Sequence, residues 1–336
     1  MGMNNLLDWQ SVEDAVWEKL VQRALHHAQH PNWTKEAFGK SLGLLFFNPS
    51  VRTRTSMELA AAQLGAFVST QNVGQGTWGF KFGEGRMEGG EAEHIVEAIG
   101  VLSRYYDMLG VRLFASLTDY EADKNEVKLR EIMAASSVPV INLESAFYHP
   151  CQALADAATL TEHFKGNPKG QKFVLSWASH PKPLPMAVPN SALLSAARLG
   201  MNVTVARPSS HALDADVMAQ ARAYAAQQGA EVVETEDLEA AVEGAQVIYA
   251  KAWGGPMVYQ NPEAEQQARL AKADWCIGTK HMAKTNAGVF MHCLPVRRDV
   301  VVETAVLQSP AAIHLRQANY RLFAQKAILE EMWGLI

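Results

Sequence analysis

One segment of the chain gathers several groups that could bind a phosphate. It contains Ser50-Val51-Arg52-Thr53 and joins an apolar, strand-like run to a predicted helix. The first N–H groups of a helix have no partner within the helix, and with the helix dipole they attract anions. Hydroxyl groups of Ser50 and Thr53 add donors, and the planar guanidinium of Arg52 matches phosphate oxygens. The segment predicts an anion site, although a simple helix cap with solvated arginines fits these residues equally well.

Two further motifs place imidazole, thiol and amide groups beside predicted strands. His149-Pro150-Cys151-Gln152 follows one strand and opens a helix, whereas His292-Cys293-Leu294-Pro295 ends a later strand. Their His and Cys side chains could be imagined as zinc ligands. However, adjacent residues on a strand point to opposite faces, so His292 and Cys293 could not easily share one ion. We therefore expect no metal.

A glycine-rich segment, residues 74–79, has the GxGxxG spacing of a dinucleotide-binding turn. The residues that follow it, 80–90, are again rich in glycine and show no helical period. Because the required helix is not predicted, the segment is more typical of a loop, in which Trp78 could be a packing anchor. A nucleotide-dependent dehydrogenase is the competing enzyme class that this pattern leaves open.

These motifs lie at the ends of elements that alternate between strand and helix, as in parallel sheets covered by helices. The predicted strands are 42–47, 66–70, 108–114, 138–143, 172–177, 202–206, 246–250 and 289–293. The predicted helices are 56–64, 94–106, 152–164, 191–199, 215–228 and 317–333. The pattern predicts an α/β fold.

The chain has 336 residues, which is long for one domain and sufficient for two. A turn rich in glycine, proline and lysine, 165–170, follows the helix that begins near Cys151, so we place the domain change at that helix. Residues 1–150, joined by the C-terminal helical segment 317–336, form the first predicted domain, and residues 151–316 form the second. Each is expected to contain a parallel sheet flanked by helices.

Composition excludes several classes of partner. A net charge of -5 argues against a nucleic-acid surface, which needs a concentrated basic face. The chain has no apolar run near the ~20 residues that span a bilayer, and its first 20 residues lack a signal-peptide core. Three cysteines are too few for a disulfide framework. We expect a cytoplasmic protein that binds small molecules, without nucleic acid, membrane or cofactor.

The phosphate-binding segment, Ser50-Val51-Arg52-Thr53, resembles the carbamoyl-phosphate loop of the aspartate and ornithine transcarbamoylases. The motifs at 149–152 and 292–295 resemble two others of that family, in the family's order, and Arg321 matches an arginine of its final helix. The resemblance covers nearly the whole chain. It implies a two-domain transcarbamoylase that moves the carbamoyl group of carbamoyl phosphate to an amine.

The resemblance also implies a role for each matched residue. The phosphate would rest on Ser50, Val51, Arg52 and Thr53, with Arg321 and with Trp78 from the neighbouring subunit of a homotrimer. The carbonyl oxygen would face Thr53, Arg112 and His149, while Gln152 and the backbone carbonyls of Cys293 and Leu294 would accept from the carbamoyl amide. Arg52, Thr53, Arg112 and His149 would be the catalytic residues. On its own, Arg112 could equally be a solvated charge at a strand end.

Two segments, 249–255 and 177–185, indicate the class of the acceptor substrate, because they resemble segments of the N-acetylornithine and N-succinylornithine transcarbamoylases. Lys251 would neutralise the α-carboxylate, Glu144 would contact the amino end and His180 would line the acyl pocket. A strand-end lysine and a capping glutamate are the alternatives for the first two. The Asp and the Ser-Met-Gly loop with which ornithine enzymes recognise a free amino group are not visible.

Two positions separate the acetyl and succinyl types. The resemblance places Ala92 where the acetyl type carries glutamate, and Val301 where it carries a lysine that can be modified to a negatively charged carbamate. Loss of negative charge favours an acyl group that itself ends in a carboxylate. We therefore expect N-succinylornithine to be the substrate, in arginine biosynthesis, with N-acetylornithine as the alternative. A non-catalytic phosphate-binding paralogue is a more remote one.

Overall fold

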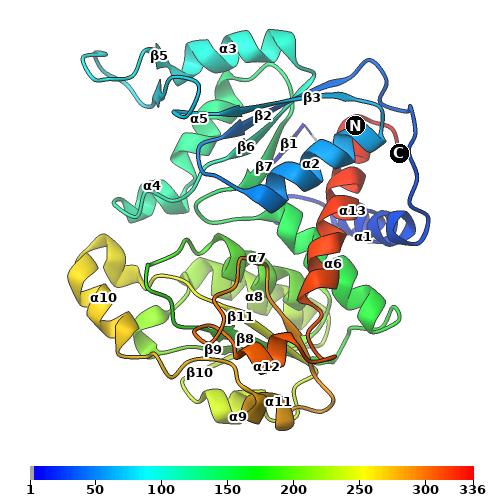
Figure 1. Cartoon of the computed structure of the whole chain (residues 1–336), viewed down its shortest axis with the longest axis vertical. Helices are drawn as coiled ribbons and strands as arrows, with labels where there is room; N and C mark the ends of the chain where they lie inside the picture. Colours follow the sequence, from blue (N-terminus) through cyan, green and yellow to red (C-terminus); the bar gives the residue numbers. More distant parts are fainter. Residues whose placement is uncertain (1–3) are drawn as a thin grey trace. The chain divides into compact units, whose positions relative to one another are not determined.

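The computed structural model describes residues 4–336, which form two units, each built on a five-stranded parallel sheet (Figure 1). The first unit comprises the residues up to Ser116, Glu121–Ala155 and Tyr320–Ile336. The second comprises Leu117–Tyr120 and Asp156–Asn319. The predicted fold class, α/β with two helix-flanked parallel sheets, is confirmed. The first three residues of the domain predicted to start at residue 1 lie outside the described residues.

The sheet of the first unit has the order β1-β7-β6-β2-β3, and all of its strands run parallel. The strands are β1 (Asn5–Leu6), β7 (Val140–Glu144), β6 (Met108–Arg112), β2 (Ser41–Phe46) and β3 (Phe67–Asn72). The three inner strands are apolar and almost wholly buried, as expected for a parallel sheet covered on both faces.

One face of this sheet packs against two helices, α3 (Ile95–Tyr105) and α5 (Val127–Ala135). Ile99 of α3 and Ile132 of α5 are buried in a cluster with Leu45 of β2. The other helices with residues in this unit are α1 (Asp14–Gln29), α2 (Val51–Gln63), α4 (Tyr120–Lys124), α6 (Pro150–His163) and α13 (His314–Met332). A short pair, β4 (Phe80–Lys81) and β5 (Glu93–His94), completes the unit.

The second sheet has the order β10-β9-β8-β11-β12 and is also parallel. Its strands are β10 (Val232–Thr235), β9 (Asn202–Ala206), β8 (Lys172–Trp177), β11 (Val247–Lys251) and β12 (Val289–Met291). Its helices are α7 (Ala187–Arg198), α8 (Ala215–Gln227), α9 (Leu238–Val242), α10 (Pro262–Leu270), α11 (Thr279–Ala283) and α12 (Thr304–Leu307), with 3-10 turns η1 (Ser209–His211) and η2 (Pro256–Tyr259).

In both sheets the strand order reverses at an inner pair of strands. From β2 the chain continues outward to β3, then returns to the other side of β2 to form β6 and β7. From β8 it continues to β9 and β10, then returns to form β11 and β12. Ligands of open α/β sheets bind outside the carboxyl ends of the strands at such a reversal. The fold therefore points to the ends of β2 and β6 in one unit and of β8 and β11 in the other.

The structure departs from the predicted elements in several places. Helix α2 begins at Val51, five residues before the predicted start. The elements that were not predicted are α1, α4, α5, α9, α10, α11 and α12 and the strands β1, β4, β5 and β10. Segment 74–79 lies in turns and coil ahead of β4, and no helix follows it, so it is not a dinucleotide-binding turn. Among residues 4–336, none of the helices is both long and apolar enough to cross a membrane.

Candidate active site

The phosphate-binding segment lies at the carboxyl end of β2, where it turns into α2. Ser50 caps this helix, and its hydroxyl accepts a hydrogen bond from the Thr53 N–H at 3.2 Å. The helix consequently starts at Val51, whose side chain is exposed, and Arg52 is half-buried in the first turn. This arrangement aims the N–H groups of the first turn at the space outside the sheet. Such a helix start is able to hold an anion.

A buried arginine from the C-terminal helix meets this segment. Arg321 donates from Nη2 to the Thr53 hydroxyl at 3.0 Å and from Nη1 to the Gln152 Oε1 at 2.8 Å. All three side chains are buried. Both acceptors are neutral, so these two hydrogen bonds orient the guanidinium without neutralising its charge. Three segments that are distant in sequence thus present one cation and two hydrogen-bonding groups beside the helix start.

A second cluster forms at the ends of β6 and β7. A register shift between Val111 and Arg112 sets Arg112 opposite Glu144, and the Arg112 Nη1 forms an ion pair with the Glu144 Oε2. The same carboxylate oxygen lies 3.4 Å from the His149 Nε2. The Arg112 guanidinium also stacks over Phe114, 4.4 Å from the ring centroid. Glu144 therefore holds the orientation of both an arginine and a histidine at the edge of the sheet.

Cys151 lies within the His149–Gln152 motif but is not a candidate nucleophile. Burial raises the pKa of its thiol to about 11, so the thiolate is scarce near neutral pH. Its side chain is fully buried and contributes to packing. The chemistry available at this edge of the sheet is consequently that of cations and hydrogen-bond donors.

Trp78 lies outside both clusters in this unit. Its side chain is 59% exposed, and the indole Nε1 donates to the Glu93 carboxylate at 2.9 Å. Ala92 is exposed immediately before β5. These two positions predicted from the sequence therefore share one loop, residues 73–93, and neither is buried within its own subunit.

In the second unit, His180 follows β8 and is held as a neutral imidazole. The Arg297 Nε lies 3.0 Å from the His180 Nε2, and because a guanidinium only donates, this ring nitrogen must accept. The proton is thereby assigned to Nδ1, which lies 2.8 Å from the Lys182 carbonyl oxygen. Burial lowers the pKa of His180, and the cations of Arg297, Lys251 and Arg269 lower it further.

Lys251 ends β11 beside His180. It pairs with Trp177 in the sheet, and its carbonyl accepts from the Ala178 N–H at 3.1 Å. The side chain is half-buried, and within residues 4–336 its ammonium forms no ion pair with a carboxylate. A cation in this position is able to bind a carboxylate from solution.

The segment after β12 holds an unusual backbone. Leu294 has φ +59°, a left-handed conformation that leucine rarely adopts, and its N–H donates to the His292 Nδ1 at 2.8 Å. The His292 N–H in turn donates to the Gln317 Oε1 at 2.9 Å. Cys293 and Val301 are both buried. Within residues 4–336, no group of three His, Cys, Asp or Glu side chains is placed to hold a metal ion.

The structure thus brings most of the predicted site residues together within each unit. Ser50, Thr53, Gln152 and Arg321 form one cluster, and Arg112, Glu144 and His149 form another, while His180 and Lys251 share an edge of the second sheet. Glu144 was predicted to contact the acceptor, but its carboxylate is paired with Arg112 and His149. Phe114 was missed, although its position two residues after Arg112 would have suggested stacking.

Comparison with known proteins identifies the family to which the chain belongs. Residues 4–162 match the carbamoyl-P binding domain of the aspartate/ornithine carbamoyltransferases, and residues 186–332 match their Asp/Orn binding domain. N-acetylornithine carbamoyltransferase of Xanthomonas campestris pv. campestris is 43% identical over 335 residues, 98% of this chain and 97% of the relative. N-succinylornithine carbamoyltransferase of Bacteroides fragilis is 36% identical over 294 residues, 87% of each chain.

Solved structures agree in fold. N-acetylornithine transcarbamylase complexed with acetylcitrulline has a TM-score of 0.93 and 41% sequence identity, with 97% of this chain and 98% of that one covered. A variant of the same enzyme, in which alanine replaces a glutamate, has the same TM-score and identity and covers 97% and 99%. This variant was solved with carbamyl phosphate and N-succinyl-L-norvaline.

Proposed function

Since this chain belongs to the aspartate/ornithine carbamoyltransferase family, in its N-acylornithine branch, we propose that it carbamoylates the side-chain amine of N-acetylornithine. Carbamoyl phosphate would be the donor, and the products would be N-acetylcitrulline and phosphate, in arginine biosynthesis. The observation that carries the proposal is the convergence of Thr53, Gln152 and Arg321 beside a helix start. Cations and N–H donors are what a carbamoyl phosphate site needs.

We assign the phosphate to the Ser50–Thr53 segment. The N–H groups at the start of α2 and the guanidinium of Arg52 would bind its oxygens, and Arg321 would add a second cation. Because the hydrogen bonds of Arg321 to Thr53 and Gln152 fix the guanidinium plane, little side-chain entropy would be lost on binding. The phosphate is the leaving group, so the same cations would stabilise the charge that it gains.

The carbonyl oxygen would face Arg112, Thr53 and His149. Negative charge develops on this oxygen as the amine attacks the carbon, and fixed donors in a site shielded from water stabilise it. The carbamoyl NH2 would donate to Gln152, whose Oε1 has a second lone pair beside the one used by Arg321. The departing phosphate would take the proton of the amine, so no protein base is required.

Lys251 and His180 are our candidates for binding the acceptor. The Lys251 ammonium would pair with the α-carboxylate, and the neutral His180, fixed by Arg297, would line the acyl pocket. Backbone carbonyls of Cys293 and Leu294 would bind the carbamoyl amide. Since Glu144 is paired with Arg112 and His149, we now propose that it orients these two residues and does not contact the acceptor.

N-succinylornithine is a second candidate for the acceptor. The expectation from Ala92 and Val301 favoured it, but the greater identity to N-acetylornithine carbamoyltransferases, 43% against 36%, favours the acetyl compound. One observation keeps the succinyl reading testable. The structure of the related acetyl enzyme in which alanine replaces a glutamate was solved with N-succinyl-L-norvaline. The resemblance places Ala92 at a position where the acetyl type carries glutamate, so this chain has alanine there without mutation.

The assay that decides between these readings compares ornithine, N-acetylornithine and N-succinylornithine as acceptors for the purified protein. We expect the highest kcat/KM for N-acetylornithine, and no turnover at all would leave only a phosphate-binding paralogue. Ala92→Glu, with Ala92→Ser as a matched control, tests the specificity position. If the wild type prefers the succinyl compound and only Ala92→Glu reverses that preference, succinyl is the native acyl group.

Arg52→Ala tests the phosphate assignment, with Arg54→Ala as its control. Arg54 lies on the same helix but pairs with Glu58 at 2.9 Å on a partly exposed face. We expect a ~100-fold loss of turnover in the first variant, on the scale of lost oxyanion donors, and little change in the second. Equal activity of the two variants would remove Arg52 from the site.

We also propose a closed homotrimer in which Trp78 completes the site of a neighbour. Strand β3 is an edge of its sheet, and Phe67 at its start is 65% exposed, so an unpaired strand edge with an exposed aromatic side chain is available for contact with another subunit. The exposed indole of Trp78 fits the same role. Cyclic symmetry would let each subunit serve the next one.

A further inference from the structure

Glu126 is a buried carboxylate that none of the proposed catalytic steps uses. It lies between α4 and α5, its side chain is 4% exposed, and its backbone has φ +53° and ψ +38°. This left-handed conformation is uncommon for glutamate and costs energy. The surrounding contacts must therefore maintain it.

All three donors that bind this carboxylate come from one turn. Oε1 accepts from the Ser145 hydroxyl at 2.5 Å and from the Phe147 N–H at 2.8 Å, while Oε2 accepts from the Ala146 N–H at 3.3 Å. Charge-assisted hydrogen bonds of this kind are about twice as strong as neutral ones. Glu126 thus supplies acceptors for the backbone N–H groups of Ala146 and Phe147 in this turn.

The turn is closed on its other side by Asn142. The Asn142 Nδ2 donates to the Ser145 hydroxyl oxygen at 2.8 Å and lies 3.2 Å from the Tyr148 carbonyl oxygen. The Ser145 N–H donates to the same carbonyl at 2.9 Å. Residues 145–148 therefore form one hydrogen-bonded unit between Glu144, which pairs with Arg112, and His149, whose Nε2 lies 3.4 Å from the Glu144 carboxylate.

We infer that Glu126 is a positioning residue for carbamoyl transfer, which fixes the 145–148 turn and through it the placement of Glu144, His149 and Arg112. This inference rests on the proposed function for its kinetic consequences. The structural part of the inference, that the buried Glu126 carboxylate holds the 145–148 turn, does not depend on which substrate the enzyme uses.

If Glu126 has this role, its ionisation should make the catalytic rate depend on pH. Burial raises the pKa of Glu126 to about 7, and the nearby Asp123 adds to the rise, while the hydrogen bonds from the turn oppose it. When the carboxyl group takes up a proton, one oxygen becomes a donor that faces the donors of the turn. The ordered turn therefore requires the carboxylate, so the catalytic rate should fall as the pH drops through about 7.

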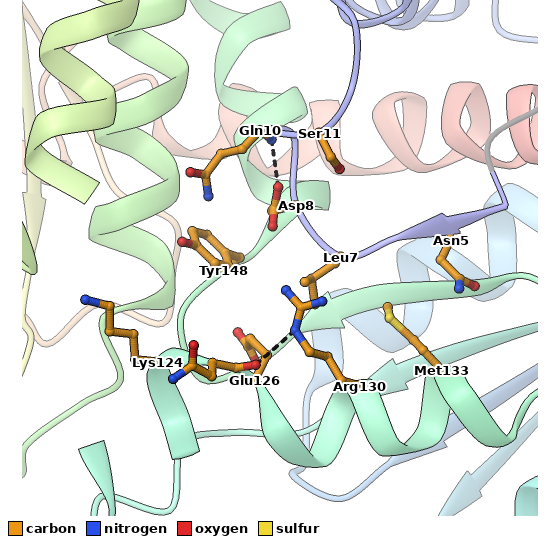
Figure 2. A pocket seen from close by; sticks show the side chains of 11 residues that line it. Asn5, Leu7, Asp8, Gln10, Ser11, Lys124, Glu126, Arg130, Met133 and Tyr148 are labelled. Carbon is orange, nitrogen blue, oxygen red and sulfur yellow. Dashed lines mark hydrogen bonds between the residues drawn. The ribbon is translucent and has the colours of Figure 1, made fainter. Parts of the chain in front are cut away.

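Glu126 is one of the residues that line a cavity of about 560 Å³. Figure 2 shows Asp8, Lys124, Arg130 and Tyr148 around the same cavity. Asp123 is the charged neighbour whose carboxylate adds to the raised pKa of Glu126. Burial is the largest cause of that rise.

Glu126→Gln is the direct test, because glutamine keeps the shape but always presents donors on one side. We expect kcat at pH 8 to fall about 10- to 100-fold, the scale for misplaced catalytic groups, with a smaller change in KM. The acid limb near pH 7 should disappear from the rate profile of the variant. Glu121→Gln, an exposed change on α4, is the matched control and should keep the wild-type profile. A wild-type rate and acid limb in Glu126→Gln would overturn the inference.

Ser145→Ala decides the question if Glu126→Gln does not fold. The Ser145 hydroxyl lowers the pKa of Glu126, so its loss should move the acid limb of the rate profile to higher pH. An unmoved limb would contradict the positioning role.

Hydrogen exchange separates this inference from the proposed function. The Ala146 and Phe147 amides should exchange faster in Glu126→Gln than in the wild type, whatever reaction the enzyme performs. If the wild type transfers no carbamoyl group but these amides lose protection, the proposed function fails and the structural role of Glu126 stands. Unchanged protection of both amides refutes that role.

Discussion

Arg321 donates from its Nη2 to the hydroxyl of Thr53 at 3.0 Å, across 268 positions of sequence. The bond fixes the end of the guanidinium against the helix that begins the phosphate segment. Since the Thr53 N–H is itself bound to the Ser50 hydroxyl, the guanidinium and the capped helix are linked through Thr53.

Replacement of Arg321 by lysine should therefore weaken carbamoyl phosphate binding even though the charge is kept. A lysine cannot donate to Thr53 and Gln152 at once and still face a phosphate with a planar fork. We expect KM for carbamoyl phosphate to rise about 10-fold or more, with a smaller loss of kcat, as loss of hydrogen bonds to a charged group implies. Steady-state kinetics measure this directly. Arg316→Lys, on the same helix but at its exposed face, should behave as wild type.

Arg112→Ala should reduce both activity and stability, which differs from the expectation for a solvated strand-end arginine. The change leaves the Glu144 carboxylate, with a side chain only 13% exposed, without its main partner. Breaking a buried pair costs about 3 kcal/mol or more in unfolding free energy. The double variant Arg112→Ala with Glu144→Gln should recover stability in urea unfolding but not activity. Recovery of activity in the double variant would show that Arg112 acts only structurally.

A shared site predicts complementation between inactive chains. In the proposed trimer, Arg52→Ala would remove the phosphate contact from a subunit's own segment, and Trp78→Ala would remove the group offered to a neighbour. When the two variants are unfolded and refolded together, some mixed trimers contain a site with an intact Arg52 and an intact Trp78. We expect partial activity in the mixture and none in either variant refolded alone. An active monomer, detected by light scattering, would contradict the shared site.

Glu330 should make stability depend on pH in the acid range. It is fully buried and accepts from the Arg23 guanidinium at 2.7 and 2.8 Å, with the His27 Nε2 at 2.8 Å. Burial alone would raise the pKa of Glu330, but these partners outweigh it and hold the pKa at about 2, below the ordinary 4.5. The unfolded chain therefore takes up the proton first as the pH falls. The stabilisation, about 3 kcal/mol, is complete above pH 4.5 and is lost towards pH 2.

Urea unfolding at several pH values measures this dependence. Glu330→Gln should lower stability at pH 7 and flatten the decline between pH 4.5 and 2, whereas the exposed Glu18→Gln should leave both unchanged. A wild-type slope in Glu330→Gln would assign the acid sensitivity to other carboxylates.

Local sequence signals sufficed for the inner strands of both sheets. Strands such as Asn202–Ala206 were predicted at their observed bounds because they are short apolar runs flanked by turn residues. Strand β10 was missed because it is an edge with two exposed residues and no clear alternation. The start of α2 was predicted too late, although Ser50, three residues before Thr53, carried the signal of a helix cap.

Long-range pairing was the part that the sequence could not supply. The pairing of Glu144 with Arg112 depends on the register shift between β6 and β7. The amino-acid sequence of neither strand indicates this shift. The turn held by Glu126 was missed for a related reason, since the left-handed backbone at a glutamate follows from tertiary contacts and not from propensity. Arg321 was found only through resemblance to a family.

The first unit of this enzyme can be completed only when the end of the chain has been synthesised. The second unit is nearly continuous in sequence, whereas the first is completed by Tyr320–Ile336, which the ribosome makes after all of the second unit. Glu330 and Arg321 both belong to this late segment. The pairs of Arg23 and His27 with Glu330, and of Thr53 with Arg321, can therefore form only after the segment has been synthesised. Domains that emerge early usually fold first. Here the first unit contains the last residues of the chain, so a chain that stops before residue 320 lacks both Arg321 and Glu330.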